Sequence, residues 1–190
     1  MPLLVAPALP AGSLATQEQP HLPVRAGLSL RPWRDDDAPA VRVAFDCPAI
    51  QRWHVRRLDS DEEARAWTAQ WATRWRAETD ASWAIVDAGD RPVGQVGLRG
   101  VLLSEATADV SYWVVPAARG RGIAAGALDA LTGWSFTRAG LHRLALEHST
   151  ANAASCRVAA RAGYRAEGVR RESVRHADGW HDMHLHARLA

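Results

Sequence analysis

The sequence predicts one α/β domain, with a mixed β-sheet of about six to seven strands and helices on both faces of the sheet. Its 190 residues, 47% of them hydrophobic and 23% charged, have the size and composition of a single globular domain. Segments with the two-residue period of strands are interspersed with segments of helical period. Three strands follow one another directly and later strands are separated by helices, so the sheet should be mixed. We expect residues 25–190 to form the domain and residues 1–24 an N-terminal arm.

The first half of the domain is predicted to contain one strand and then helices. Gly27–Trp33 has strand character, and the carboxylates of Asp35–Asp37 suit the start of a helix that runs to Phe45. Ser60 and Glu63 have the spacing of a capping box. The helix that they open carries tryptophans at four-residue intervals, which we expect to pack in the core: Trp67, Trp71 and Trp75.

The second half is predicted to hold the remaining strands and two helices. Strands are expected at Ser82–Asp87, Val93–Leu98, Ala106–Val115, Leu144–His148, Tyr164–Arg170 and Met183–Leu189. Gly122–Arg138 is predicted to be a helix that Gly140 stops. A second helix is predicted at Asn152–Ala162, with Asn152 as its N-cap.

The loop between the strand ending at Val115 and the helix starting at Gly122 is rich in glycine and arginine. A helix N-terminus offers unpaired N–H groups and partial positive charge to an anion. Glycines let the anion approach the main chain, and arginines add donors. The loop therefore predicts a diphosphate site made by Arg119, Gly120, Arg121, Gly122, Ile123 and Ala124.

Two cofactors fit such a loop. Gly120-x-Gly122-x-x-Ala125 matches the dinucleotide fingerprint, with Glu147 ending a later strand, which would suit an NAD(P)-dependent oxidoreductase. However, Pro116–Arg119 lengthens the turn before the first glycine, and several elements precede the loop, whereas the fingerprint usually opens its fold. Coenzyme A is therefore the favoured cofactor.

Several spaced segments resemble the GCN5-related N-acetyltransferases (GNAT), and in particular their RimJ/RimL-like branch. Arg119-x-x-Gly122-x-Ala124 is similar to motif A of that family. The resemblance covers roughly residues 27–189 and includes ADVSYW at 108–113, N-x-x-S at 152–155, GY-x-x-EG at 163–168 and the C-terminal G-x-x-D and H-A-x-L segments. The chain departs from the pattern at Asp109, where Glu is usual, and it has Ala159 where many relatives outside the branch carry a Tyr that acts as general acid.

The resemblance implies an enzyme that moves an acetyl group from acetyl-CoA to a primary amine in a ternary complex. Ser155 would stand at the leaving thiolate and Asp109 would act as the base, with Glu147, His148 or water as alternatives. Val114, Val115 and Asn152 would contact the pantetheine arm. The acceptor would be a protein N-terminus or a small-molecule amine. Trp53 and His54 are candidates to line its pocket.

Other features limit the remaining function classes. A net charge of +2 and the absence of a long apolar segment predict neither nucleic acid nor membrane as a partner, although a non-catalytic CoA- or RNA-binding module stays an alternative. His181, His184 and His186 invite a metal interpretation, since positions 184 and 186 share a strand face, but without a cysteine or a matching carboxylate geometry no metal is expected. Two distant cysteines and an arginine-only basic set suggest a bacterial, cytoplasmic protein. The apolar arm and the resemblance predict a homodimer.

Overall fold

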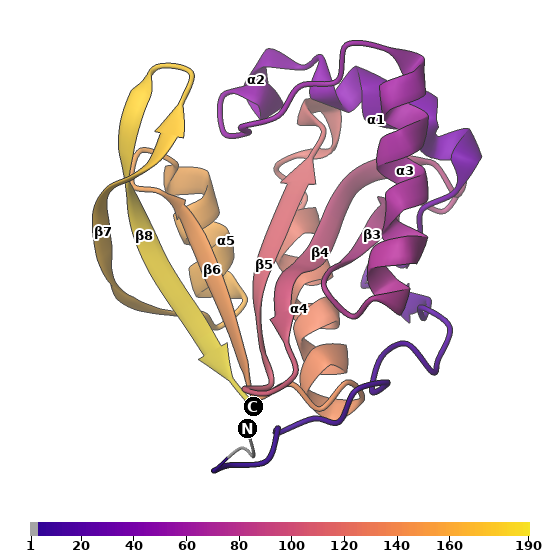
Figure 1. The fold of residues 1–190 in the computed structure, drawn as a ribbon. Helices are drawn as coiled ribbons and strands as arrows, with labels where there is room; N and C mark the ends of the chain where they lie inside the picture. Colours follow the sequence, from indigo (N-terminus) through magenta and orange to yellow (C-terminus); the bar gives the residue numbers. More distant parts are fainter. Residues whose placement is uncertain (1–3) are drawn as a thin grey trace.

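The computed structural model describes residues 4–190, and its centre is one β-sheet with helices on both faces (Figure 1). The strands are β1 (Leu22–Pro23), β2 (Ser29–Pro32), β3 (Ala81–Val86), β4 (Pro92–Leu102), β5 (Thr107–Val114), β6 (Arg143–Ser149), β7 (Arg165–His176) and β8 (Gly179–Leu189). The helices are α1 (Ala38–Phe45), α2 (Pro48–Gln51), α3 (Asp61–Arg76), α4 (Ile123–Thr137) and α5 (Ala153–Arg161), with short 3-10 turns at Asp35–Asp37 and Pro116–Ala118.

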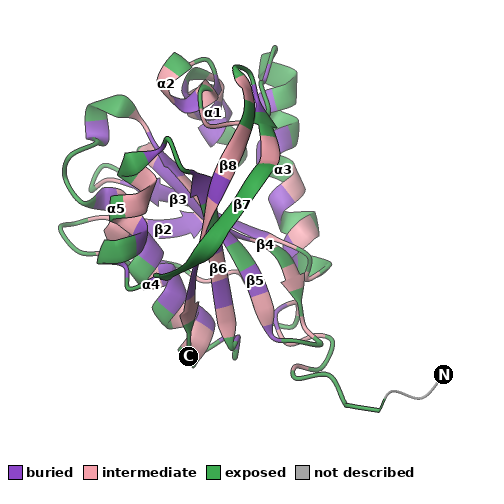
Figure 2. Cartoon of the chain, turned by 90° about the vertical axis from the view of Figure 1, so that its left-hand side faces the viewer, coloured by how far each residue is buried: buried purple, intermediate pink, exposed green. Residues whose placement is uncertain are grey.

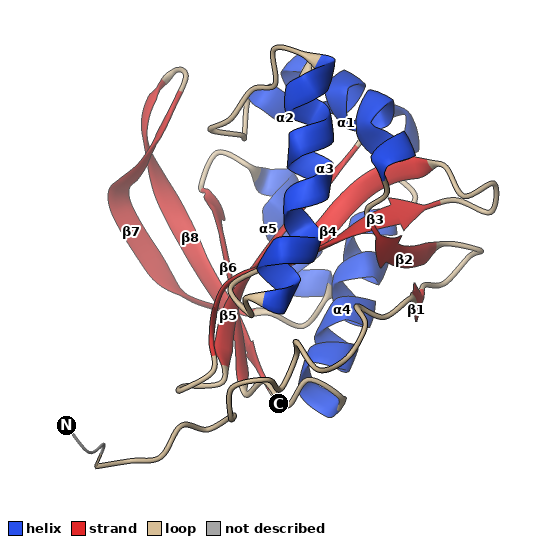
Figure 3. Ribbon diagram, turned by 45° about the vertical axis from the view of Figure 1, so that its right-hand side comes forward, coloured by secondary structure: helices blue, strands red, loops and turns tan. Residues whose placement is uncertain are grey.

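The sheet has the strand order β1-β2-β3-β4-β5-β6-β8-β7, and β5–β6 is its single parallel pair within the described residues. Helices α1 and α3 cover one face, while α4 and α5 cover the other (Figure 3). The predicted mixed α/β class is confirmed. The sheet has eight strands rather than six to seven, because Leu22–Pro23 adds a short strand beside β2.

Local sequence signals account for several helix boundaries. Ser60 caps α3 by accepting the N–H of Glu63 (3.1 Å), as its capping-box spacing predicted. The Glu63 carboxylate, however, accepts the N–H of Asp59 (2.6 Å) rather than that of Ser60. Asn152 caps α5, as predicted, by accepting the N–H of Ser155 (3.1 Å). Helix α2 lies in a segment from which no helix was predicted, since it is a single turn.

Residues of the predicted N-terminal arm lie on the domain. The Glu78 carboxylate accepts N–H groups from Gly12, Leu14 and Ala15 at 2.6–3.2 Å, and Leu14 is buried in the core. Although burial opposes the ionisation of Glu78, these three bonds hold its pKa below the usual value. The arm therefore packs on its own chain. The homodimer stays a prediction that now depends on the resemblance alone.

The tryptophans pack in the core, as their helical spacing predicted. Trp67 and Trp71 of α3 join α1 and Trp113 in one hydrophobic cluster. Trp75 reaches the larger cluster, where its ring centroid lies 6.0 Å from that of Trp83. Edge-to-face pairs of this kind add to the free energy gained from burial.

Strands β5 and β6 pair over only part of their length. Thr107–Val110 is paired with Arg143–Leu146, yet β5 continues to Val114 and β6 to Ser149. Beyond the paired residues the two strands diverge, as Figure 1 shows, and β6 continues beside β8. The opening leaves one edge of β5 without a strand neighbour. This opening positions the site described below.

The β7–β8 hairpin ends the chain at the far edge of the sheet. Most of β7 is exposed (Figure 2), and the strand carries several arginines, which discourage edge-to-edge pairing. None of the helices in residues 4–190 has both the length and the apolar character that a membrane crossing requires.

Candidate functional site

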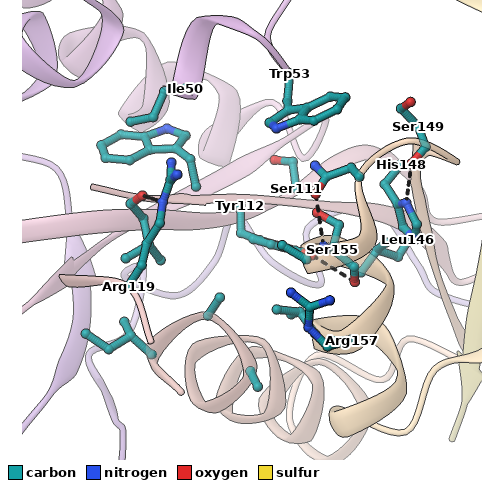
Figure 4. A pocket seen from close by; sticks show the side chains of 18 of the residues that line it. Ile50, Trp53, Ser111, Tyr112, Arg119, Leu146, His148, Ser149, Ser155 and Arg157 are labelled. Carbon is teal, nitrogen blue, oxygen red and sulfur yellow. Dashed lines mark hydrogen bonds between the residues drawn. The ribbon is translucent and has the colours of Figure 1, made fainter. Parts of the chain in front are cut away.

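A cavity of about 440 Å³ occupies the opening between β5 and β6. Its wall is formed by the free end of β5, the end of β6, the starts of α4 and α5, and α2 with the residues that follow it. Figure 4 shows Trp53 on one side of the cavity and Arg157 on the other, with Tyr112 and Ser155 between them. The cavity thus brings the glycine-rich loop and the N-x-x-S segment to one place.

The glycine-rich loop has the geometry that an anion site needs. Gly120 (φ +79°) and Gly122 (φ +73°) adopt left-handed backbone, which glycine tolerates without strain. The first hydrogen bond of α4 runs from the N–H of Gly126 to the carbonyl of Gly122, so the N–H groups at the helix start have no partner within the helix. Gly120, Gly122, Ile123 and Ala124 line the cavity, as do Ala118 and Ala125.

The two arginines of the loop occupy different environments. Arg119 lines the cavity, where its Nε donates to the Val114 carbonyl (2.9 Å) and an Nη donates to the Ala49 carbonyl (3.4 Å). Its guanidinium thereby ties the end of β5 to α2. Arg121 is exposed and is not among the lining residues, and neither is Val115.

Two basic lining residues were missed in the sequence. Arg157 and Arg161 of α5 both belong to the wall of the cavity, and Figure 4 shows Arg157 on the side opposite Trp53. Their four-residue spacing puts them on one face of the helix, which is a signal that the sequence contained. Only the fold shows that this face borders the glycine-rich loop. Together they give that end of the cavity a positive charge.

The start of α5 presents Ser155 to the cavity. The two hydrogen bonds that link Ser155 to other site residues both use its backbone: its N–H donates to Asn152 Oδ1 (3.1 Å), and its carbonyl accepts a long contact from the Tyr112 hydroxyl (3.5 Å). Burial raises the pKa of Tyr112 to about 12, so its hydroxyl stays protonated. Tyr112 was not singled out in the sequence.

The candidate bases are not equally placed. Asp109 lies in the paired part of β5, opposite Ala145, and is not a lining residue. Partial desolvation raises the pKa of Asp109 against the influence of Arg170 and Arg143. Glu147 does line the cavity, and its carboxylate lies 3.4 Å from a guanidinium nitrogen of Arg170.

His148 also belongs to the lining. Burial lowers its pKa, so its imidazole is neutral near pH 7, and its Nδ1 lies 2.8 Å from the Ser149 carbonyl. Because side chains alternate along a strand, at most one of Glu147 and His148 would be expected to face the site. Both line it because the edge of β6, rather than one face, borders the cavity.

The other end of the cavity is largely aromatic. Trp53 and His54, the candidate pocket residues, both line it, together with His176 and Ser111. Burial, with Arg99 and Arg56 nearby, lowers the pKa of His54 to about 4. Within residues 4–190, His54 Nδ1 and Ser111 Oγ are buried without a hydrogen-bond partner, so this end offers polar atoms to a ligand.

The two segments that carry much of the resemblance to N-acetyltransferases, the glycine-rich loop before α4 and the N-x-x-S segment at the start of α5, meet at this cavity. The model of the Acetyltransferase (GNAT) domain family matches residues 28–165. The chain therefore belongs to this family and is an N-acetyltransferase.

Similar proteins agree with this assignment. YoaA of Bacillus subtilis (strain 168), described as an uncharacterized N-acetyltransferase, is 24% identical over 147 residues, or 76% of this chain and 83% of YoaA. Mycobacterium smegmatis RimJ, solved with a coenzyme A disulfide, is 27% identical with a TM-score of 0.80 over 90% of this chain and 86% of its own. RimL, a ribosomal L7/L12 alpha-N-protein acetyltransferase solved with coenzyme A, is 22% identical with a TM-score of 0.81 over 90% of this chain and 98% of its own. The resemblance to the RimJ/RimL-like branch is confirmed.

The oxidoreductase alternative is not supported. The glycine-rich loop follows β5, which pairs antiparallel with β4, whereas a dinucleotide fingerprint opens a unit of parallel strands. Membership of the acetyltransferase family also decides against a module without catalytic activity.

Proposed function

We propose that this enzyme transfers an acetyl group from acetyl-CoA directly to a primary amine, on a protein N-terminus or a small molecule, within a ternary complex. The observation that carries the proposal is the opening between β5 and β6, which joins an anion site at one end to an aromatic pocket at the other. The RimL and RimJ structures contain coenzyme A or its disulfide, which supports the same donor here.

We assign the donor one direction in the cavity. Its diphosphate is assigned to the backbone of Arg119–Ala124 at the start of α4, beside the positive charge of Arg157 and Arg161. Its pantetheine arm is assigned to the edge of β5 up to Val114, where main-chain groups lack a strand neighbour. The thioester then lies near Ser155, and the amine enters beside Trp53.

The reaction needs a base for the ammonium proton, donors for the oxyanion of the tetrahedral intermediate and a group at the leaving sulfur. The neutral amine attacks the carbonyl carbon and the C–N bond forms; the C–S bond then breaks, and the leaving thiolate takes up, directly or through water, the proton that the nitrogen loses. We assign Ser155 to the leaving sulfur, where its hydroxyl can donate a hydrogen bond as negative charge develops. A base must first take a proton from the ammonium group of the acceptor.

Glu147 is the better placed carboxylate for this proton, directly or through water, because it lines the cavity and Asp109 does not. The matched variants Glu147→Gln and Asp109→Asn decide between them. We expect Glu147→Gln to lower kcat/KM by roughly 10²- to 10⁴-fold, the range for general bases, and Asp109→Asn to have the smaller effect. The reverse order would make Asp109 the base.

The function itself is tested by free-thiol release from acetyl-CoA. The acceptors would be peptides with free or N-acetylated first residues and a panel of small primary amines. Release with free amines, and none with the blocked peptides, is the expected result. Mass spectrometry should find one acetyl group on the product amine. Thiol release that does not depend on any amine, or coenzyme A binding without turnover on the whole panel, would contradict the proposal.

A further inference from the structure

Three histidines and one cysteine lie together behind the wall of the cavity. One ligand atom from each of His148, Cys156, His184 and His186 lies within 4.8 Å of those of the other three. Among these four residues His148 alone lines the cavity, and none of them was given a role in the transfer reaction apart from His148 as an alternative base. The cluster therefore needs its own explanation.

The fold brings the four side chains from three segments to one face of the sheet. His148 of β6 and His184 of β8 are direct cross-strand partners, and His186 follows two residues later on the same face of β8. Cys156 comes from the first turns of α5, the helix that packs over this part of β6. The cluster therefore combines three histidines from two paired strands with one cysteine from the helix that covers those strands.

Without a ligand, the cluster leaves polar atoms unsatisfied. The side chains of His148 and His186 are 6% and 5% exposed. The Nδ1 atoms of His184 and His186 are buried and find no hydrogen-bond partner among residues 4–190. Burial of an unpaired imidazole nitrogen is unfavourable, and the lone pair of His184 Nδ1 is free to bind a cation.

The distances suit a tetrahedral metal ion. His148 Nε2 and His186 Nε2 share a hydrogen bond and lie 3.2 Å apart, so a metal ion between them would replace that bond. Two nitrogens bound to one zinc ion at 2.0–2.1 Å stand about 3.3 Å apart in a tetrahedron. A pair at the 4.8 Å limit of the cluster would have to close by about 1.5 Å, which side-chain torsions can supply.

A neighbouring contact fixes the orientation of one ring. His148 Nδ1 lies 2.8 Å from the Ser149 carbonyl, which can only accept a hydrogen bond, so the proton is on Nδ1. The lone pair of Nε2 then points into the cluster. Metal-bound histidines are oriented in the same way by a carbonyl or carboxylate on the other ring nitrogen.

We propose that His148, Cys156, His184 and His186 form a zinc site. Imidazole and thiolate ligands favour Zn²⁺ over Mg²⁺ or Ca²⁺, which require oxygen. Four protein ligands complete the tetrahedron and leave no open position, so the ion is structural. It joins β6, β8 and α5 directly beside Ser155, and binding releases the thiol proton of Cys156. The site does not depend on the identity of the amine acceptor.

The test is Zn²⁺ binding by the full chain. Any polyhistidine tag is removed, bound metal is stripped by a chelator, and the chain is then incubated with Zn²⁺ and dialysed to remove the excess. We expect about one Zn²⁺ per chain to remain after dialysis, measured by plasma mass spectrometry, and the Tm to rise when Zn²⁺ is added. Co²⁺ should give the visible absorption of a tetrahedral site together with a thiolate charge-transfer band.

Matched variants assign the ligands. Cys47→Ser leaves Cys156 as the single cysteine and should keep the thiolate–Co²⁺ band, whereas Cys156→Ser should lose it. His186→Gln should lower the bound Zn²⁺ at least tenfold, and His142→Gln, at an exposed histidine outside the cluster, should not. The Cys47→Ser spectrum decides the question even if a cluster variant fails to fold. The proposal would be overturned if the unaltered chain failed to retain Zn²⁺, or if Cys156→Ser and His186→Gln retained as much Zn²⁺ as the unaltered chain.

Discussion

Replacement of Ser155 by Ala should slow turnover without much loss of stability. The hydrogen bonds that tie Ser155 to Asn152 and Tyr112 use its backbone N–H and carbonyl, so both survive in Ser155→Ala. The helix cap is therefore kept. Ala is also a good residue for a helix interior, and we expect the free energy of unfolding to change by less than about 0.5 kcal/mol.

The kinetic effect follows from when the hydroxyl acts. A neutral thioester sulfur is a weak acceptor, whereas the leaving thiolate accepts a charge-assisted hydrogen bond worth about 1.5–3 kcal/mol. An interaction made only in the transition state lowers kcat when it is lost. Ser155→Ala should thus reduce kcat by roughly 10- to 150-fold and leave KM for acetyl-CoA nearly unchanged.

Asn152→Ala is the matched comparison. Its side chain caps α5, and the loss of a cap costs about 0.5–2 kcal/mol of stability. We expect this variant to show a lower Tm and a higher KM rather than a selective fall in kcat. The assay is steady-state thiol release at saturating amine, with single-turnover kinetics to show that chemistry limits the rate. A wild-type single-turnover rate for Ser155→Ala would refute the role assigned to its hydroxyl.

Three further predictions concern the cofactor loop, the core and the response to acid. Gly122→Ala, which puts a Cβ at φ +73° in the cavity wall, should weaken coenzyme A binding at least tenfold by calorimetry, whereas Gly100→Ala, at φ +55° outside the cavity, should not. In Asp37→Asn the Arg31 guanidinium, 3% exposed and bonded to both Asp37 oxygens (2.7 and 2.9 Å), keeps only the exposed Asp90 carboxylate (2.7 Å) as counter-ion; we expect a loss of about 1–3 kcal/mol in denaturant unfolding, and no measurable loss would contradict this. The pKa of His54 is about 4 in the folded protein and about 6.5 in the unfolded chain, so the unfolded chain takes up a proton first as the pH falls. The free energy of unfolding is therefore unaffected by this group above pH 6.5 and is lowered by up to about 3 kcal/mol as the pH falls towards 4. His54→Gln should flatten the acid limb of the Tm–pH curve, and an unchanged limb would show that other groups cause it.

Features set by neighbours in the chain were predictable from the sequence. The cap of α3 at Ser60, the cap of α5 at Asn152 and the left-handed glycines before α4 follow from backbone chemistry within a few residues. The tryptophan stripe of α3 follows from the helical period, which shows that one face is apolar and therefore buried. The order of such signals was also enough to indicate the family.

The tertiary structure decided what depends on pairing between distant segments. Strand order places β8 between β6 and β7 and opens the sheet after Val110, and neither follows from periodicity. The opening left Asp109 in the paired region and brought Glu147, Arg157 and Tyr112 to the cavity.

The histidine–cysteine cluster shows the same limit most clearly. His184 and His186 are two residues apart in sequence, yet the other two members of the cluster lie on β6 and α5. Cys156 is at least 28 positions away from them in the sequence, and His148 is at least 36 positions away. The periodicity of a segment predicts only which face of its helix or strand each side chain lies on. Which side chains meet across that face depends on strand register and helix packing, because long-range contacts are fixed by the burial of the whole core and not by any one segment.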